Sequence, residues 1–355
     1  MRPTTATIDL SALRQNLGVV RKHVPRSKVF AVIKANAYGH GVLRAARALV
    51  DADGFALVEL DAAVRLREAG YRQRIALLEG CFEAREVPVV VQHKLTTVVH
   101  SEEQLRMLDS APAGSAIDVL VKLNTGMNRL GFQPDEFPDA LSRLRAHGAV
   151  GSVTLMTHFA AADDARGVAW QLEALERVAR GTGLPRSLAN SAAIIRYPET
   201  GADWVRPGIM LYGSSPFQDR SAVDLDLKPA MTLASEVIAV RNLARGDTVG
   251  YGGLYTAEAP VRVGVVACGY ADGYPRHAPT GTPVLAGDRL TGTLGRVSMD
   301  MLCVDLTGIE HARVGTPVTL WGAGNPVEKV AQSAGTVGYE LLCALASRVH
   351  VVERP

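Results

Sequence analysis

The sequence has no long uncharged apolar run, so it predicts no transmembrane helix. Its first ten residues, MRPTTATIDL, lack the apolar core of a secretion signal, and we therefore expect a cytoplasmic protein. The formal net charge is only +2, which argues against a dedicated nucleic-acid- or polyanion-binding protein. We expect no nucleic-acid partner and no membrane partner.

Paired cysteines and metal-ligand patterns are also missing. The four cysteines show no C-x-x-C spacing, which excludes a zinc ribbon and provides no disulfide framework. No set of His, Asp, Glu and Cys residues shows ligand spacing, so we predict no metal site. Each cysteine is expected to pack as a small buried hydrophobe. They are Cys81, Cys268, Cys303 and Cys343.

What the chain does contain is a large apolar fraction in a regular arrangement. It has 355 residues, of which 47% are hydrophobic and 21% charged, enough for about two domains. Apolar runs separated by helical patterns indicate parallel strands that are buried on both faces. The eight predicted strands cover residues 29–33, 55–58, 75–78, 96–99, 117–123, 153–156, 187–189 and 205–211. The main helical patterns cover residues 9–24, 43–50, 62–69, 102–108, 137–147 and 167–180.

Eight strand–helix units predict an α/β fold, a (β/α)8 TIM-type barrel over residues 1–228. An open doubly wound sheet is the alternative, because the seventh strand is short and barely apolar. After residue 229 the apolar runs become short and are broken by Gly, Asp and Pro. This texture predicts a mostly-β C-terminal domain over residues 229–355.

Unusual polar residues fall where the predicted barrel strands end, and the active sites of such barrels lie at those ends. Lys34 is the most informative of them, because a buried ammonium is costly unless it is paired or used chemically. A lysine that loses its charge can form a Schiff base. Phosphate sites in barrels commonly use the loops after strands seven and eight, which here contain Ser191, Gly208 and Ile209. Arg129 and His158 also follow predicted strands, and Arg206 lies in the eighth.

A series of motifs along nearly the whole chain resembles the alanine racemases, a barrel-fold family that uses pyridoxal phosphate. The motifs are AVIKANAYGHG, TGMNRLG, THFA, NSAA, RPGIMLYG, VGYGGLY, GYADGY and GRVSMD, in the family's order. Several motifs in a fixed order are far more specific than any one alone. The resemblance implies an isomerase with pyridoxal phosphate as its cofactor.

The resemblance also implies roles for individual residues. Lys34 would carry the cofactor, and Lys34 and Tyr251 would be the two catalytic bases. Arg206 would face the pyridine nitrogen, and His158 would lie beside it in the cofactor site. The residues that would bind the phosphate are Tyr38, Ser191, Gly208, Ile209 and Tyr339.

Further implied roles concern the substrate. Arg129 and the backbone at Met299 would hold the substrate carboxylate. Lys122 aligns with a position that is often carbamylated and orients the arginine; the alternative for Lys122 is a buried ion pair. Asp163 and Tyr270 align with the path by which the substrate reaches the site.

The predicted reaction is the interconversion of L-alanine and D-alanine, with D-alanine supplied to bacterial cell-wall synthesis. Two bases on opposite faces can remove the α-proton and return it without rotating the substrate. Because Lys34 and Tyr251 fall in different predicted domains, the resemblance implies a homodimer in which each chain supplies Tyr251 to the other. The alternatives are a racemase for serine or a broader set of amino acids, a decarboxylase of the same barrel family, and a non-catalytic cofactor-binding protein.

Overall fold

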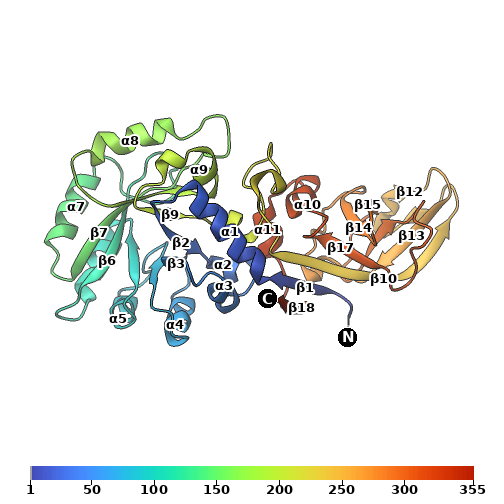
Figure 1. Ribbon diagram of the computed structural model, residues 1–355, viewed down its shortest axis with the longest axis horizontal. Coiled ribbons are helices and arrows are strands. Elements are labelled where there is room, and N and C mark those ends of the chain that lie inside the picture. Colours follow the sequence, from blue (N-terminus) through green and yellow to red (C-terminus); the bar gives the residue numbers. More distant parts are fainter. Residues whose placement is uncertain (1) are drawn as a thin grey trace. The chain divides into compact units, whose positions relative to one another are not determined.

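The computed structural model describes residues 2–355, which form two compact units (Figure 1). The barrel unit comprises Asn16–Ala37 and Gly41–Leu211. The β unit comprises the N-terminal residues up to Gln15, Tyr38–His40 and Tyr212–Pro355. The division into domains at residues 228 and 229 stays a prediction.

In the barrel unit, eight parallel strands close into a ring in chain order, from β2 to β9. This confirms the predicted (β/α)8 barrel and shows that the open sheet was wrong. The strands are mostly apolar because the ring buries one face and the helices cover the other. They are β2 (Lys28–Val32), β3 (Gly54–Leu57), β4 (Arg74–Leu77), β5 (Thr96–Val99), β6 (Ile117–Lys122), β7 (Val150–Met156), β8 (Arg186–Asn190) and β9 (Trp204–Arg206).

Helical segments surround this ring, and the longer ones bury an apolar face. In α7, Phe137, Ala140, Leu141 and Leu144 are buried, which is the 3-4-3 spacing of one helical face. The helices are α2 (Lys34–Tyr38), α3 (Val42–Ala48), α4 (Leu60–Glu68), α5 (Val87–Gln92), α6 (Glu102–Met107), α7 (Phe137–Ala146), α8 (Ala169–Ala179) and α9 (Ser191–Arg196). The short α2, α5 and α9 have no counterpart among the predicted helices.

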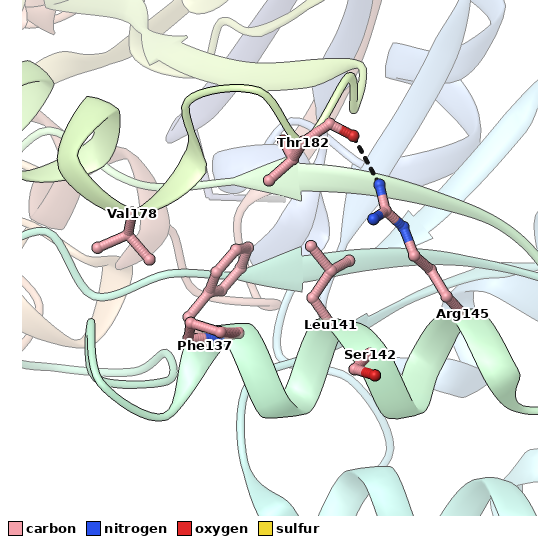
Figure 2. Close-up of a pocket in the computed structure, with 7 residues that line it drawn as sticks. Phe137, Leu141, Ser142, Arg145, Val178 and Thr182 are labelled. Carbon is pink, nitrogen blue, oxygen red and sulfur yellow. Dashed lines mark hydrogen bonds between the residues drawn. The ribbon is translucent and has the colours of Figure 1, made fainter.

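A groove of about 260 Å³ lies on the outside of the barrel, between α7 and the C-terminal part of α8 (Figure 2). Phe137 and Leu141 line it, and Arg145 Nη2 closes one side by donating to the Thr182 carbonyl at 2.6 Å. None of the predicted site residues lines this groove.

Neighbouring strands and residues explain two details of the predicted strands, the presence of the seventh and the length of the eighth. The doubtful seventh strand is present as β8, because pairing with β7 and β9 compensates for its weak apolar pattern. The eighth strand ends at Arg206, so its predicted extension to residue 211 was wrong. Pro207 has no N–H for a ladder, and the chain continues into a 3₁₀ helix at Ile209–Tyr212.

The β unit is built on an eight-stranded sheet in the order β13-β16-β15-β14-β17-β10-β1-β18, and a further pairing of β13 with β10 closes six of these strands into a ring. This confirms the mostly-β prediction. The strands are β1 (Thr5–Asp9), β10 (Met231–Leu243), β13 (Val261–Val266), β14 (Pro283–Ala286), β15 (Arg289–Leu294), β16 (Leu302–Asp305), β17 (Pro317–Trp321) and β18 (His350–Arg354). A separate two-stranded sheet joins β11 (Thr248–Val249) and β12 (Tyr255–Thr256).

The N-terminal strand β1 was not predicted. It pairs antiparallel with β10 and parallel with β18, so its partners lie more than 200 residues away in sequence. The chain then enters α1 (Leu10–His23), where Asp9 Oδ1 accepts the Ala12 N–H at 2.9 Å. Two further helices, α10 (Val327–Ser333) and α11 (Gly338–Cys343), complete the unit. No helix within residues 2–355 has the length and apolar character needed to cross a bilayer.

Candidate active site

Three neighbouring strands of the barrel unit bring predicted site residues to one end of the ring. β9 pairs with both β8 and β2, and all three run parallel. Lys34 follows β2, Ser191 follows β8, and Arg206 is the last residue of β9. Because carboxyl ends of parallel strands meet at the same end of a barrel, these residues share the face on which barrel active sites lie.

The backbone directly after Lys34 is unusual. Ala35 to Tyr38 all have φ between 51° and 55°, so α2 is a turn of left-handed helix. For residues with a Cβ, this conformation costs about 1–2 kcal/mol each. Hydrogen bonds from the Ala37 N–H to the Ile33 carbonyl (3.0 Å) and from the Gly41 N–H to the Asn36 carbonyl (2.8 Å) hold the turn. Such strain persists only where the surroundings impose it, and it is typical of functional segments.

Arg206 is held rigidly inside the barrel, with 4% of its surface exposed. Its Nη1 donates to the carbonyl (2.6 Å) and hydroxyl (2.7 Å) of Ser187. Its Nη2 donates to the carbonyl of Thr157 (2.6 Å) and that of Leu188 (3.2 Å). Burial lowers the pKa of Arg206 to about 10, so the guanidinium still carries its charge at neutral pH.

His158 lies beside this guanidinium, with its Nδ1 3.4 Å from Arg206 Nη2. A guanidinium only donates, so Nδ1 can accept from it, while Nε2 faces Asn190 Nδ2 at 3.5 Å. Burial, together with the charges of Arg206 and Lys122, holds the pKa of His158 well below its usual value. His158 is therefore neutral at physiological pH.

Ser191 begins α9 and is buried. Its Oγ accepts the Gly208 N–H at 2.8 Å, and the Met210 N–H points to the same oxygen at 3.4 Å. The helix cap itself is supplied by Asn190, whose Oδ1 accepts the Ala193 N–H at 3.0 Å. A hydroxyl and nearby backbone N–H groups are the kinds of donor that bind phosphate in proteins.

Lys122 is a buried cation among other cations. It ends β6 with 5% of its surface exposed. Burial, followed by repulsion from Arg206 and Arg129, lowers the pKa of Lys122 to about 8, while Glu79 acts in the opposite direction. A substantial fraction of this amine is thus neutral near physiological pH.

The loop that leads to Arg129 is organised by Asn124. Its Oδ1 accepts the N–H groups of Gly126 and Asn128, each at 3.0 Å, and its Nδ2 donates to Asn128 Oδ1 at 2.9 Å. Asn128 has a φ of 55°, a conformation that asparagine adopts more readily than most residues. Arg129 itself is exposed at the end of this turn, as is Asp163 in the loop after β7.

In the β unit, Tyr38 stacks on Tyr212 with ring centroids 4.6 Å apart, and Tyr339 lies 6.0 Å from Tyr38. Burial, together with Tyr339, raises the pKa of Tyr38 well above its ordinary value. The Tyr38 hydroxyl therefore keeps its proton and can act as a donor. The structure thus brings together two of the residues predicted to bind phosphate.

The remaining predicted residues of the β unit lie on its surface. Tyr251 is 71% exposed in a glycine-rich turn, and Met299 is 53% exposed. Tyr270 is 37% exposed and belongs to a segment that lies directly against that of Met299. The N–H of Tyr270 donates to the Ser298 carbonyl, and that of Ala271 to the Met299 carbonyl, both at 3.0 Å.

A network of charges that the sequence analysis missed holds these two segments. Asp272, 1% exposed, accepts from Arg348 Nε at 2.7 Å, Arg2 Nη2 at 3.0 Å and the Gly269 N–H at 2.9 Å. Arg348 Nη2 also donates to Asp300 at 2.7 Å, next to Met299. Asp272 could have been suspected from the GYADGY motif, but its partners are too distant in sequence to identify.

Comparisons with known proteins agree with this architecture. The family model for the alanine racemase N-terminal domain matches residues 8–216, and that for the C-terminal domain matches residues 230–353. An alanine racemase of Nitrosospira multiformis is 60% identical, and one of Nitrosomonas europaea 56%; the match covers 99% of this chain with each, and 99% and 98% of those proteins. The crystal structure of the biosynthetic alanine racemase from Pseudomonas aeruginosa has a TM-score of 0.97 at 48% identity, with both chains covered completely. The chain belongs to the alanine racemase family.

Proposed function

We propose that this protein is an isomerase that interconverts L-alanine and D-alanine with pyridoxal phosphate as cofactor, and so supplies D-alanine for peptidoglycan. The observation that carries the proposal is the placement of Lys34, Ser191 and Arg206 at the ends of three adjacent strands. The named relatives favour alanine over serine. The presence of both family domains argues against a single-barrel cofactor-binding protein.

The residues fit the cofactor in their donor chemistry. Ser191 and the backbone N–H groups of Gly208 and Ile209 would hold the phosphate, and the hydroxyls of Tyr38 and Tyr339 would donate to it. Lys34 would hold the aldehyde carbon covalently through its amine. Arg206 would lie at the ring nitrogen.

When bound, pyridoxal phosphate supplies an electron-withdrawing ring that acidifies the α-hydrogen of an amino acid. Lys34 and Tyr251 would each exchange a proton with the α-carbon, one on each face. Arg129 and the Met299 backbone would hold the carboxylate, so that the α-hydrogen points to one base at a time. Asp163 and Tyr270 would line the path of the substrate.

Arg206 limits what the site can do. Five acceptors on Ser187, Thr157, Leu188 and His158 fix its guanidinium, and it has no acceptor atom of its own. It would donate to the ring nitrogen without releasing a proton, and His158 would remain neutral beside it. This arrangement favours return of the α-proton over side reactions such as transamination.

Lys122 would be carbamylated. Carbamate formation joins a neutral amine to carbon dioxide and releases one proton, and the pKa of about 8 makes the neutral amine available. The product is an anion beside Arg129 and Arg206, which offsets the repulsion that those cations exert on the lysine.

The site would be shared between two chains of a homodimer. Tyr251 is 71% exposed, and a catalytic base needs a surface that excludes water around it. On this proposal, Tyr251 of the partner subunit would act with Lys34 of the first chain.

The reaction is tested by incubating the purified protein with L-alanine in D2O, followed by chiral chromatography and mass analysis. D-alanine that carries solvent deuterium at the α-carbon is the expected result. Cofactor absorbance without exchange would contradict an alanine substrate, and absence of both would contradict the role of Lys34.

The shared site is tested by mixing an inactive Lys34→Ala chain with an inactive Tyr251→Phe chain under conditions that exchange subunits. Each hybrid dimer would contain one intact site, so activity should return toward a quarter of the wild-type value at equal mixing. No recovery, with exchange proven by differential tags, would overturn the composite site.

A further inference from the structure

A fully buried glutamine in α8 joins the loops that follow β6 and β7. Gln171 Nε2 donates to Thr125 Oγ1 at 2.8 Å and to the His158 carbonyl at 3.0 Å. Its Oε1 accepts the Ala160 N–H at 2.7 Å. The side chain has 0% exposure and uses both of its donors and its carbonyl oxygen.

The amide is the start of a directed chain of hydroxyls. Thr125 Oγ1 lies 2.7 Å from Thr157 Oγ1, which in turn donates to the Leu123 carbonyl at 3.0 Å. Each hydroxyl has a single hydrogen. Because that of Thr157 is donated to Leu123, Thr125 must donate to Thr157, and Gln171 must donate to Thr125.

This series of hydrogen bonds ends beside His158 and Arg206, which are proposed to serve the cofactor. The carbonyl of Thr157 accepts from Arg206 Nη2 at 2.6 Å, and His158, the next residue, lies 3.4 Å from the same nitrogen. Thr125 begins the turn that leads to Arg129. Gln171 thus holds the chain on both sides of His158, which contacts Arg206.

The helix does not need a polar residue at this position for its own stability. The buried face of α8 consists of Gln171, Leu175 and Ala179, at intervals of four residues, and the other two are apolar. A methionine of similar length would continue this face. The polar amide is therefore explained by the loops that it holds.

A second glutamine makes the same kind of bridge elsewhere in the barrel. Gln104 Nε2 donates to the carbonyls of Glu79 (2.7 Å) and Cys81 (2.9 Å), and its Oε1 accepts the His100 N–H at 3.0 Å. It joins the loops after β4 and β5, which contain none of the residues proposed to bind cofactor or substrate. Gln104 is 7% exposed, so it is a matched control for burial and hydrogen bonding.

We propose that Gln171 is a positioning residue, which sets the geometry of His158 and Arg206 through the Thr125–Thr157 chain, whereas Gln104 only stabilises the barrel. The inference rests on the proposed function, because it assumes that Arg206 and His158 serve the cofactor.

The experiment compares Gln171→Met with Gln104→Met in the full-length protein. Both should lower the thermal midpoint similarly, because each removes three buried hydrogen bonds. Only Gln171→Met should lower kcat/KM for alanine, by roughly ten- to a hundredfold, because misplacement of a reacting group by about 1 Å has effects of this size. It should also weaken binding of pyridoxal phosphate to the apoprotein, and hydrogen exchange should quicken in residues 124–130 and 157–162.

Equal values of kcat/KM and cofactor affinity in the two variants would overturn the proposal. If the wild-type protein binds pyridoxal phosphate but does not racemise alanine, only the proposed function is contradicted. The role of Gln171 is then still tested by cofactor affinity and hydrogen exchange. A wild-type protein with neither property would overturn both.

If Gln171→Met does not fold, Thr125 provides the test. Thr125→Ser keeps the hydroxyl and should retain activity and affinity, whereas Thr125→Val removes the relay and should lose both to a similar degree as the glutamine change. If the serine and valine variants both fold and have equal activity and cofactor affinity, the proposed role of the Thr125–Thr157 hydroxyl chain is overturned.

Discussion

Most of the buried predicted site residues lie in the barrel unit, and most of the exposed ones lie in the β unit. In the barrel unit, Arg206 and Ser191 are each 4% exposed and are bonded to neighbouring strands or loops. In the β unit, Tyr251 and Met299 are more than half exposed. If the proposed function holds, the groups that would face the cofactor are ordered within one chain, whereas Tyr251 and Met299 would need a second surface to cover them.

The difference has an energetic origin. A buried cation must recover the hydration that it loses, so Arg206 is surrounded by acceptors and Lys122 has a lowered pKa. An exposed tyrosine such as Tyr251 has no such requirement, and its position is set only by its backbone turn. Substitutions should therefore separate the two units by their effects on stability and on turnover.

The largest effect is expected for Tyr251→Phe, which changes an exposed residue of the β unit. Loss of one base should lower turnover by roughly 10²–10⁴-fold. The free energy of unfolding should change by less than about 0.5 kcal/mol, because the side chain is exposed. Solvent exchange of the α-hydrogen, followed by NMR in D2O, should be lost for one enantiomer of alanine and persist for the other. Undiminished exchange of both enantiomers would contradict the second-base role.

A smaller effect is expected for Asp272→Ala, which tests whether the β unit has a rigid support beneath its exposed residues. The change removes a buried carboxylate from Arg2 and Arg348 and should lower the free energy of unfolding by about 3 kcal/mol. Asp300, which is 43% exposed, is the control, and Asp300→Ala should cost about 1 kcal/mol or less. Denaturant titration measures both; equal losses would contradict a special role for the buried carboxylate.

The smallest effect is expected at Lys122. At a fixed pressure of ¹³C-labelled carbon dioxide, the carbamate signal in ¹³C NMR should grow as the pH rises through about 8, because only the neutral amine reacts. Lys122→Arg should abolish that signal and lower kcat/KM by about tenfold through the loss of order at Arg129. A signal that is independent of pH, or is retained in Lys122→Arg, would contradict carbamylation at this position.

The sequence predicted the barrel strands well, but it did not reveal the residues that hold the site residues in place. The strands of the barrel are visible because burial on both faces makes them continuously apolar, and Lys34 is visible because it interrupts that pattern at a strand end. Strand β1 was missed because its partners β10 and β18 are distant in sequence. Gln171 was missed because a single glutamine in a helical pattern carries no signal of its three bonding partners.

Linear patterns were enough to identify the eight strand–helix units, the chemically active residues near the strand ends, and the ordered motifs of the family. Each of these depends on local periodicity or on residue identity, which a linear pattern records. The left-handed turn after Lys34, the neutral state of His158, and the bonding of Gln171 and Asp272 are visible only in the folded structure. These properties depend on burial and on partners far away in the chain, and desolvation and hydrogen bonding exist only once the chain is folded.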